Sequence, residues 1–171
     1  MVFDFNARLL KVKQETHDVK TFRFEIPKEF TFLPGQFVMV EIGIDGNSDV
    51  RPFSISSSPT RKGFIEVTKK IGGSDFSKRL NKMDDSYSAR VKGPYGMFVL
   101  DESHDAILLA GGIGVTPFRC FMEYATDKDL DNKITLFYSN KTPEDVAFAA
   151  EFEELKRKNK NIKIISTITR R

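Results

Sequence analysis

Arg51, Phe53 and Ser54 stand close together in the segment 50–59, and their side chains suit one kind of chemistry. A guanidinium can bind a phosphate group through two parallel hydrogen bonds. An aromatic ring can stack on another flat ring, and a hydroxyl can hydrogen-bond a nitrogen at the edge of such a ring. The segment therefore predicts a site for a phosphorylated, planar, heteroaromatic cofactor. An edge strand that ends in a Ser-Pro turn explains the same residues, and the segment alone leaves both interpretations open.

The backbone of this segment decides where the three side chains point. In an extended strand alternate side chains share a face. We therefore expect Arg51 and Phe53 to point one way and Ser54 the other way, unless a bend redirects it.

A glycine-rich turn over residues 111–117 follows an apolar run. Residues 106–110 are apolar throughout, as in a strand buried on both faces of a parallel sheet. Thr116 is a favourable N-cap and Pro117 a favourable first residue of a helix, which we expect to reach about Ala125. A strand, a glycine loop and a helix start let nucleotide phosphates approach backbone amides at the positive end of a helix. We predict a nucleotide site here, although the G-x-G-x-x-G pattern is absent.

A short helix is also expected after the glycine pair at residues 72–73, with its start at Ser74 or Asp75. Free amides at a helix N-terminus, together with a hydroxyl, form a ready site for an anion. A plain helix cap without a ligand is the alternative interpretation.

Before residue 101 the pattern is typical of β-strands. Phe22, Phe24 and Ile26 alternate with charged residues, and Pro27 ends that run. Further strands are expected around residues 37–40, after residue 48 and over residues 63–71, with turns at 45–48, 72–74 and 93–96. Short strands separated by Gly and Pro predict a small antiparallel barrel.

After residue 101 strands alternate with helices, which predicts a parallel sheet. The strands are expected at residues 106–110, 134–138 and 162–168. Thr142 and Pro143 are expected to open a helix whose core-facing stripe is Phe148, Phe152 and Leu155. The basic run at 156–160 complements the C-terminal end of that helix rather than forming a nucleic-acid site. The expected fold is thus β plus α/β: an antiparallel barrel in residues 1–101 and a partial parallel-sheet unit in residues 102–171.

The overall composition excludes several classes of function. A net charge of +3 with scattered Lys and Arg argues against a nucleic-acid partner. One cysteine, Cys120, excludes an internal disulfide and an iron–sulfur site, and the separated His17 and His104 argue against zinc. No apolar run approaches the ~20 residues of a membrane span, and no signal peptide is visible. We therefore expect a cytoplasmic protein without a bound metal.

Several motifs, in this order and spacing, resemble those of the ferredoxin–NADP reductase superfamily. They are Phe32-x-Pro34-Gly35-Gln36-Phe37, Arg51-Pro52-Phe53-Ser54, Gly93-Pro94-Tyr95-Gly96 and the glycine turn 111–117. The resemblance covers nearly the whole chain. It implies a flavin-binding antiparallel barrel followed by an α/β domain that binds a pyridine nucleotide.

The resemblance also implies a flavin site. Arg51, followed by Pro52, would pair with the flavin phosphate, and Phe53 would stack on the isoalloxazine where the family usually has Tyr. Ser54 would hydrogen-bond near flavin N5, the atom that receives hydride, and is the candidate catalytic residue. The other implied flavin residues belong to the strand along the ribityl chain, the helix start at the pyrophosphate and the glycine turn. They are Val67, Thr68, Lys69, Gly73, Phe76, Ser77 and Thr116.

For the pyridine nucleotide, the resemblance implies a loop that receives the nicotinamide, made of Gly111, Gly112, Gly114 and Pro117. Arg170 resembles the residue that reads a 2′-phosphate, although a solvated chain end is an equal alternative. FAD is favoured over FMN because phosphate anchors stand at both Arg51 and Ser77. The cosubstrate is NADPH or NADH, and the choice stays open.

The sequence departs from the family pattern at its C-terminal end. Members continue through another helix and a strand ending in Cys-Gly-x-x, whose cysteine lies beside the nicotinamide. Cys120 cannot replace it, because Cys120 lies within the helix after the glycine turn. With three of five parallel strands, residues 106–110 would keep one unpaired side, an edge prone to aggregation. Either the chain is a fragment or a partner chain covers that edge.

We therefore expect a flavin-dependent oxidoreductase that moves electrons between NAD(P)H and an acceptor such as an iron–sulfur or haem protein. A non-catalytic flavin-binding electron-transfer subunit is the first alternative, and a binding protein without flavin is the second. The sequence does not identify the electron acceptor.

Overall fold

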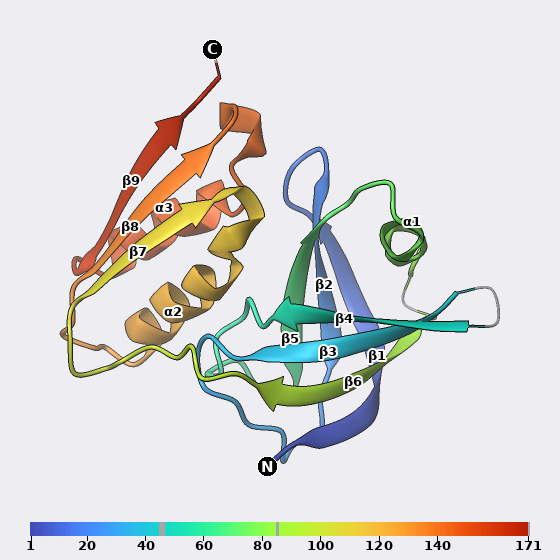
Figure 1. The fold of residues 1–171 in the computed structure, drawn as a ribbon. Coiled ribbons are helices and arrows are strands. Elements are labelled where there is room, and N and C mark those ends of the chain that lie inside the picture. Colours follow the sequence, from blue (N-terminus) through green and yellow to red (C-terminus); the bar gives the residue numbers. More distant parts are fainter. Residues whose placement is uncertain (45–46, 85, 171) are drawn as a thin grey trace.

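The computed structural model describes residues 1–44, 47–84 and 86–170, which form two units side by side (Figure 1). Six strands make one antiparallel sheet in the order β4-β3-β6-β1-β2-β5. They are β1 (Phe3–Gln14), β2 (Val19–Glu25), β3 (Phe37–Ile44), β4 (Asn47–Ser54), β5 (Phe64–Lys70) and β6 (Ser88–Tyr95). The sheet curls into a half-barrel, and Ile55, directly after β4, pairs with Val67 of β5. The expected antiparallel β unit is confirmed in this form.

The alternation of residue types explains how the curled sheet buries one face. Phe22 and Phe24 of β2 are fully buried, and so is Ile65, which lies opposite Phe24 on β5. These side chains share one core with residues of the other strands and of α1 (Asp75–Asn81), including Leu9, Val38, Val40, Ile55, Phe76, Leu80 and Val91. The aromatic residues that alternate along β2 therefore form the centre of the first core.

Two turn predictions in this unit are wrong. Asp45 and Gly46 lie outside the described residues, but Asn47 and Ser48 begin β4 rather than a loop. Gly93-Pro94-Tyr95 belongs to β6, where Gly93 lies opposite Phe3 of β1. A Cβ at Gly93 would stand 2.8 Å from Val38 Cγ1, so glycine here permits close packing of strands instead of a turn.

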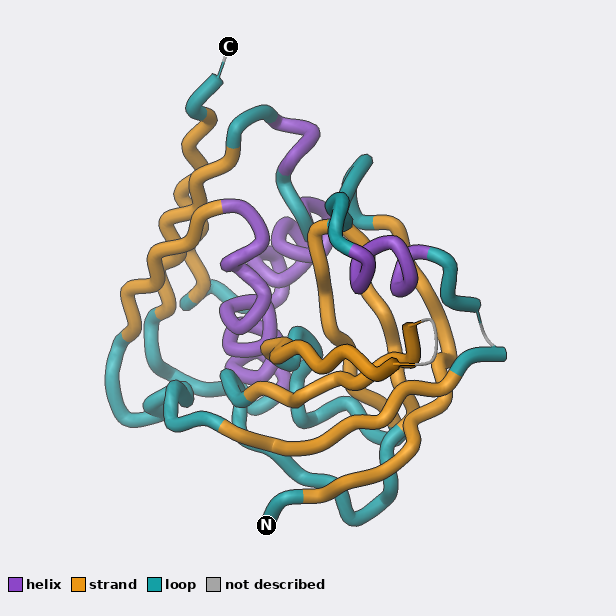
Figure 2. Tube along the Cα trace, turned by 45° about the vertical axis from the view of Figure 1, so that its right-hand side comes forward, coloured by secondary structure: helices purple, strands orange, loops and turns teal. Residues whose placement is uncertain are grey.

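The second unit is a parallel sheet of three strands in the order β7-β8-β9, as expected. The strands are β7 (Ala106–Gly111), β8 (Ile134–Asn140) and β9 (Ile162–Ile168). Helices α2 (Thr116–Asp127) and α3 (Ala149–Lys158) pack on the sheet face that looks toward the antiparallel sheet (Figure 2). Leu108 and Leu136 are buried under these helices, together with Phe118, Met122, Tyr138, Phe148 and Phe152.

The other face of this sheet is open. Ile107 and Leu109 are 75% and 73% exposed, and Phe137 of β8 is 41% exposed. The expected burial of residues 106–110 on both faces of the sheet is therefore wrong, because the helices cover one face and no described element covers the other. Among the described residues β7 pairs only with β8, so the expected unpaired edge at residues 106–110 is confirmed. Within the part of the chain that the structure describes, no helix has the length and apolar character to cross a bilayer.

Both expected helix starts in this unit are corrected. A 3₁₀ turn over Gly112–Val115 already has helical backbone, so Val115 is the N-cap of α2 and Thr116 its first residue. Thr142 caps a separate 3₁₀ turn, Pro143–Asp145, with a capping box. The chain then turns at Phe148, whose φ is +63°, and α3 begins one residue later. Burial of the Phe148 ring accounts for this break, because it stays in the core outside the helix.

The division of the chain between residues 101 and 102 stays a prediction. The last strand of the antiparallel sheet ends at Tyr95 and the first parallel strand begins at Ala106, so a connecting segment rather than a point separates the sheets.

Candidate functional site

A pocket of about 170 Å³ lies where the carboxyl ends of the parallel strands face the antiparallel sheet. We call it the interunit pocket. It is lined by Asp18, Val19 and Lys70 from the antiparallel unit, and by Gly112, Ile113, Ser139, Asn140, Lys141, Asp145, Ala147 and Thr169 from the parallel unit. In α/β sheets ligands bind at the carboxyl ends of the strands. The position of this pocket is therefore that of a ligand site.

Asn140 is a buried polar side chain that lines the pocket. It ends β8, is 4% exposed, and neither atom of its amide has a hydrogen-bond partner among the described residues. Only its backbone is engaged, since its carbonyl accepts a hydrogen bond from Thr169 N at 2.9 Å. A buried amide without partners costs free energy unless a ligand or water satisfies it. From the sequence, Asn140 is expected in the polar loop at the carboxyl end of a predicted strand, a loop that bears on the choice between NADP and NAD, but it is not among the expected site residues.

The glycine turn borders the pocket. Around Gly111, Gly112 and Gly114 no heavy atom lies within 4 Å of the position that a Cβ would take. Gly112 also has a φ of +50°, which favours glycine. The structure thus brings Gly112 to the pocket and leaves space along the turn, while Pro117 lies in the first turn of α2.

Arg170 continues the ladder between β8 and β9. Its backbone N donates to Lys141 O at 2.8 Å, and its side chain is exposed. The residue thus stands beside Lys141, directly after β8, at the same end of the sheet as the pocket.

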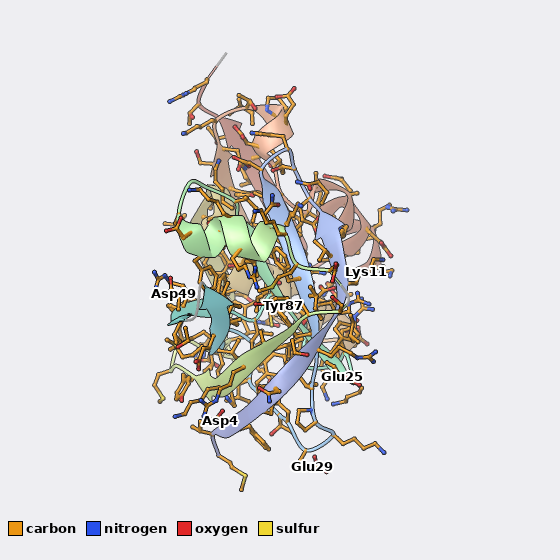
Figure 3. The ribbon with its side chains drawn as sticks, turned by 90° about the vertical axis from the view of Figure 1, so that its right-hand side faces the viewer. Asp4, Lys11, Glu25, Glu29, Asp49 and Tyr87 are labelled. Atoms are coloured by element: carbon orange, nitrogen blue, oxygen red, sulfur yellow. The ribbon has the colours of Figure 1, made fainter. Side chains whose placement is uncertain are left out.

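Arg51 and Phe53 of β4 both reach Phe76 of α1. Figure 3 shows this side of the antiparallel sheet, with Asp49 labelled on β4. The Arg51 guanidinium pairs with Asp49, donates to Val50 O at 2.9 Å and lies 5.7 Å from the centre of the Phe76 ring. The Phe53 ring stacks on the same Phe76 ring, with centres 5.8 Å apart. Since both residues reach Phe76, the predicted common side of Arg51 and Phe53 is confirmed.

The two side chains differ in their access to a ligand. The side chain of Arg51 is 53% exposed, whereas Phe53 is 9% exposed. Pro52, between them, is exposed, and Ser54 is half-buried at the end of β4. A flat ligand would therefore find the guanidinium open and the Phe53 ring largely covered, so the stacking role of Phe53 stays a prediction.

The start of α1 is capped from within the chain, as expected for a helix at Ser74. The Ser74 hydroxyl accepts a hydrogen bond from Ser77 N at 3.3 Å, and the Ser77 hydroxyl, which is buried, lies 3.1 Å from that of Ser74. Gly73 has no neighbour within 4 Å of its Cβ position. The open space at this helix start is therefore beside the glycines rather than at Ser77.

Residues 67–69 of β5 could meet a ligand mainly through their backbone. Val67 is fully buried, and Thr68 shares hydrogen bonds with the hydroxyls of Thr21 and Ser56, at 2.8 and 3.0 Å. Lys69 is half-buried. The arrangement fits the backbone contacts expected for this strand.

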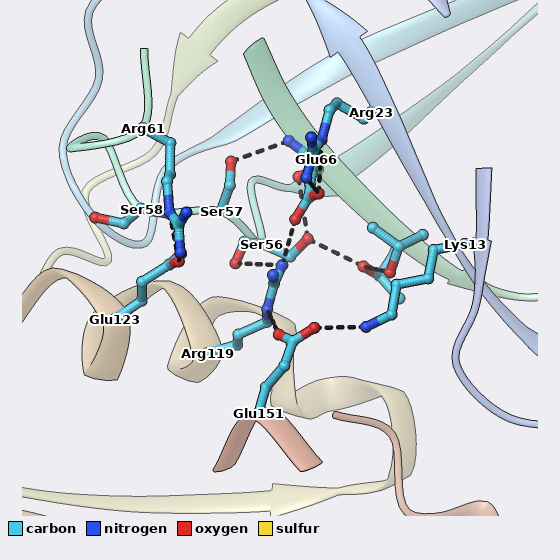
Figure 4. Close-up of polar contacts among 12 residues, drawn as sticks. Lys13, Arg23, Ser56, Ser57, Ser58, Arg61, Glu66, Arg119, Glu123 and Glu151 are labelled. Carbon is cyan, nitrogen blue, oxygen red and sulfur yellow. Dashed lines mark hydrogen bonds and ion pairs between the residues drawn. The ribbon is translucent and has the colours of Figure 1, made fainter. Parts of the chain in front are cut away.

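A cluster of charged residues joins the two units (Figure 4). Arg119 of α2 donates to Glu66 of β5 at 2.7 Å and to Glu151 of α3 at 2.6 Å. Although burial raises the pKa of the Glu66 carboxyl, the guanidiniums of Arg119 and Arg23 lower it by more, so the carboxyl stays ionised. Sequence reasoning did not find this cluster, because its partners lie up to 138 positions apart, as for Lys13 and Glu151.

Two family models divide the chain between them. Residues 6–100 match the oxidoreductase FAD-binding domain, and residues 108–171 match the oxidoreductase NAD-binding domain. The chain belongs to the ferredoxin–NADP reductase superfamily. It accordingly combines an FAD-binding unit with an NAD(P)-binding unit, and the half-barrel and the parallel sheet are the two units of this superfamily fold.

Two curated proteins are similar to most of this chain. The chain is 38% identical to sulfhydrogenase 2 subunit gamma of Pyrococcus furiosus over 159 residues, covering 88% of this chain and 54% of that protein. It is 37% identical to the glycine betaine monooxygenase reductase subunit of Chromohalobacter salexigens, covering 88% and 42%. The chain thus spans about half the length of these curated relatives.

A solved ferredoxin NADP⁺ reductase from Neisseria gonorrhoeae, with bound FAD and NADP, has the same fold. The TM-score is 0.86 at 20% identity, over 98% of this chain and 69% of that one.

The residues present fit the cofactors of the superfamily at three points. The buried amide of Asn140 has no hydrogen-bond partner among the described residues, the glycine turn 111–114 leaves open space beside its backbone, and the Arg51 guanidinium is exposed next to α1. Each of these can meet a phosphate, a ribose or an amide without a change in the fold.

Proposed function

We propose that this chain is the flavin- and nucleotide-binding part of an NAD(P)H-dependent oxidoreductase that serves an electron-carrier protein. The observation that carries the proposal is the interunit pocket, where the glycine turn and Asn140 of one unit face Lys70 of the other. Bound FAD would supply the redox chemistry, taking hydride from NAD(P)H and releasing electrons to the acceptor. The chain itself would bind and orient the two cofactors.

For the flavin, we assign the phosphates to Arg51 and to the open space beside Gly73, at the start of the helix that contains Ser77. Arg51 would exchange its exposed pairing with Asp49 for a phosphate, which accepts two hydrogen bonds from a guanidinium. The ring would lie along β4 and β5, where Ser54 offers a hydroxyl and residues 67–69 offer backbone groups. Pro52, Phe53, Phe76 and Thr116 complete the proposed flavin site.

For the nucleotide, we assign the nicotinamide end to the turn of Gly111, Gly112, Gly114 and Pro117. Asn140 would hydrogen-bond the nucleotide from the strand end, which would satisfy its amide. Arg170, held beside Lys141, is the proposed reader of a 2′-phosphate.

We further propose an iron–sulfur or haem protein as the electron-carrier partner, since the relatives above are named as subunits of larger systems. The cytoplasmic location expected from the sequence stays a prediction. A flavin-binding subunit that does not turn over NAD(P)H is the second candidate, and the exposed edge of β7 favours it.

The test is an absorbance spectrum of the purified chain, reconstituted with FAD, before and after anaerobic addition of NADPH or NADH. We expect bound flavin with a band near roughly 450 nm that bleaches with the nucleotide. Bound flavin that does not bleach would favour the second candidate. A folded chain that takes up no FAD would refute both.

Arg51→Ala tests the phosphate anchor. We expect FAD affinity to fall by about tenfold or more, the loss of one charged hydrogen-bonding partner. Arg90→Ala is the matched control, because Arg90 is 57% exposed and pairs with Asp4 on the same sheet. Equal FAD affinity in both variants would refute the assignment of Arg51.

A further inference from the structure

Arg119 is the point where three elements of the two units meet. Its side chain is 9% exposed, and one terminal nitrogen donates both to Glu66 Oε2 at 2.7 Å and to Ser56 O at 3.2 Å. Its Nε donates to Glu151 Oε2 at 2.6 Å. The guanidinium also lies 4.9 Å from the centre of the Phe148 ring. One side chain of α2 is thus fixed to β5, to the segment after β4 and to α3 at once.

The partners of Arg119 are held in turn by other cations. The second oxygen of Glu66 accepts hydrogen bonds from Arg23 at 2.8 and 3.0 Å. The second oxygen of Glu151 accepts one from Lys13 at 2.5 Å. Each carboxylate therefore has one cation from each side of the interface, and the second cation helps to hold the carboxylate in the orientation that Arg119 contacts.

The contact joins the elements on which the two cofactor sites are built. Glu66 directly precedes residues 67–69 of β5, and Ser56 comes two residues after Ser54. Arg119 comes three residues after Thr116, within one turn of the glycine loop. A shift of α2 along β5 would break this contact and would move the glycine turn relative to the flavin strand by the same amount.

Apolar contacts at the interface do not define such a register. The Phe121 ring packs against Gly35, and Cys120 is buried in the core of the half-barrel. Such contacts are non-directional, whereas a planar guanidinium with several acceptors accepts one orientation.

We propose that Arg119 is a positioning residue that holds the nucleotide unit in register with the flavin strand through Glu66. This inference rests on the proposed function. Charge alone does not suffice for the role, because an ammonium cannot present the same planar fork to Glu66 and Glu151 together. Arg119→Lys should therefore retain only part of the positioning that Arg119→Met loses.

The first test measures the register without any cofactor. Spin labels on Ser88→Cys in β6 and Lys160→Cys after α3 report the distance between the units. Burial raises the pKa of the native Cys120 thiol to about 12, so it stays unlabelled. We expect Arg119→Met to broaden the distance distribution by about twofold, since units without a fixed interface move relative to each other. An unchanged distribution in a folded Arg119→Met variant would overturn the proposal.

Arg90→Met is the matched control. Arg90 forks onto Asp4 with bonds of 2.7 and 2.9 Å, but both residues belong to the antiparallel sheet. Arg90→Met removes the same charge and the same kind of ion pair as Arg119→Met, but this ion pair does not cross the interface. Its distance distribution should therefore stay as narrow as that of the unsubstituted chain. Glu66→Gln alone should broaden the distance distribution. In combination with Arg119→Met it should add little, because both substitutions disrupt the same contact between Arg119 and Glu66.

The second test separates positioning from binding in the FAD-loaded chain. We expect Arg119→Met to lower the rate of flavin reduction at saturating NADH or NADPH about tenfold or more, with KM changed less than about threefold and FAD affinity unchanged. The rate of flavin reduction in Arg119→Lys should fall between the rates of the unsubstituted chain and of Arg119→Met. A rise in KM alone would make Arg119 a binding residue and overturn the proposal. If the unsubstituted chain is not reduced, the proposed function fails, and the spin-label distances still decide the register.

Discussion

The two sheets of this protein protect their apolar surfaces in different ways. The antiparallel sheet curls around its own core, and its outer strands approach where Ile55 pairs with Val67. The parallel sheet is covered by α2 and α3 on one face, while Ile107 and Leu109 of β7 are exposed on the other. Curling lets one sheet cover its own inner face, whereas an open parallel sheet needs other elements on both faces.

This difference bears on the candidate sites. Apart from Thr116 of α2, the proposed flavin residues lie on or beside a sheet that is nearly closed, so their positions depend on contacts within that unit. The interunit pocket depends on how the parallel unit sits against it. That placement rests on the charged cluster around Arg119 and on the packing of Phe121 against Gly35.

The same substitution, Ile to Lys, should affect stability very differently in the two sheets. Ile65→Lys buries an ammonium in the core of the half-barrel and should destabilise the fold by more than about 4 kcal/mol. Ile107→Lys places the charge on an exposed edge and should change the free energy of unfolding by less than about 0.5 kcal/mol, while reducing self-association. Urea denaturation and sedimentation measure both effects. Comparable destabilisation by the two variants would contradict the exposure of β7.

Gly35→Ala tests the apolar contact between the units. Gly35 has a φ of +100°, and a Cβ there would lie 2.5 Å from Phe121 Cε1 and 2.3 Å from Phe98 O. The strained backbone and the clash should lower the free energy of unfolding by about 3 kcal/mol, measured by thermal denaturation. Gly43→Ala is the control, because no atom lies within 4 Å of its Cβ position. A similar loss in both variants would show that the contact with α2 is not tight.

The charged cluster predicts a pH dependence of stability. The folded-state pKa of Glu66 is below the ordinary glutamate value of 4.5, because Arg119 and Arg23 outweigh the effect of burial. Its contribution is therefore complete above pH 4.5 and is lost as the pH falls through the folded-state pKa. We expect Glu66→Gln to be less stable than the unsubstituted chain at pH 7, with a smaller further loss on acidification. Parallel stability profiles for the two proteins would contradict this.

The smallest effect is expected at Cys120, which belongs to α2 but is buried in the core of the half-barrel. Burial raises its pKa from 9.0 to about 12, so the thiol stays protonated at pH 8. Burial also keeps reagents away from the sulfur, since Cys120 has no exposed surface. A thiol reagent should give no measurable reaction with the folded chain and complete reaction in urea. Rapid reaction of the folded chain would mean that α2 separates from the half-barrel.

The sequence alone predicted the features that depend on neighbouring residues. Alternation around Phe22 and Phe24 identified β2, a continuous apolar run identified β7, and the repeated strand–helix pattern identified β8. The helix cap at Ser74 also lies where expected. These succeed because side-chain period and capping are set within a few residues. The motifs around Arg51 and the glycine turn also indicated the superfamily, which the family models confirm.

Only the tertiary structure decided the features that depend on residues far apart in the sequence. Gly93-Pro94-Tyr95 is strand rather than turn because it pairs with β1 and β3, and α3 starts late because the Phe148 ring is buried. Asn140 and Arg119 acquire their roles from residues that no local pattern connects with them. Packing selects which side chains face a pocket or an interface, because both arise only when segments far apart in the chain come together.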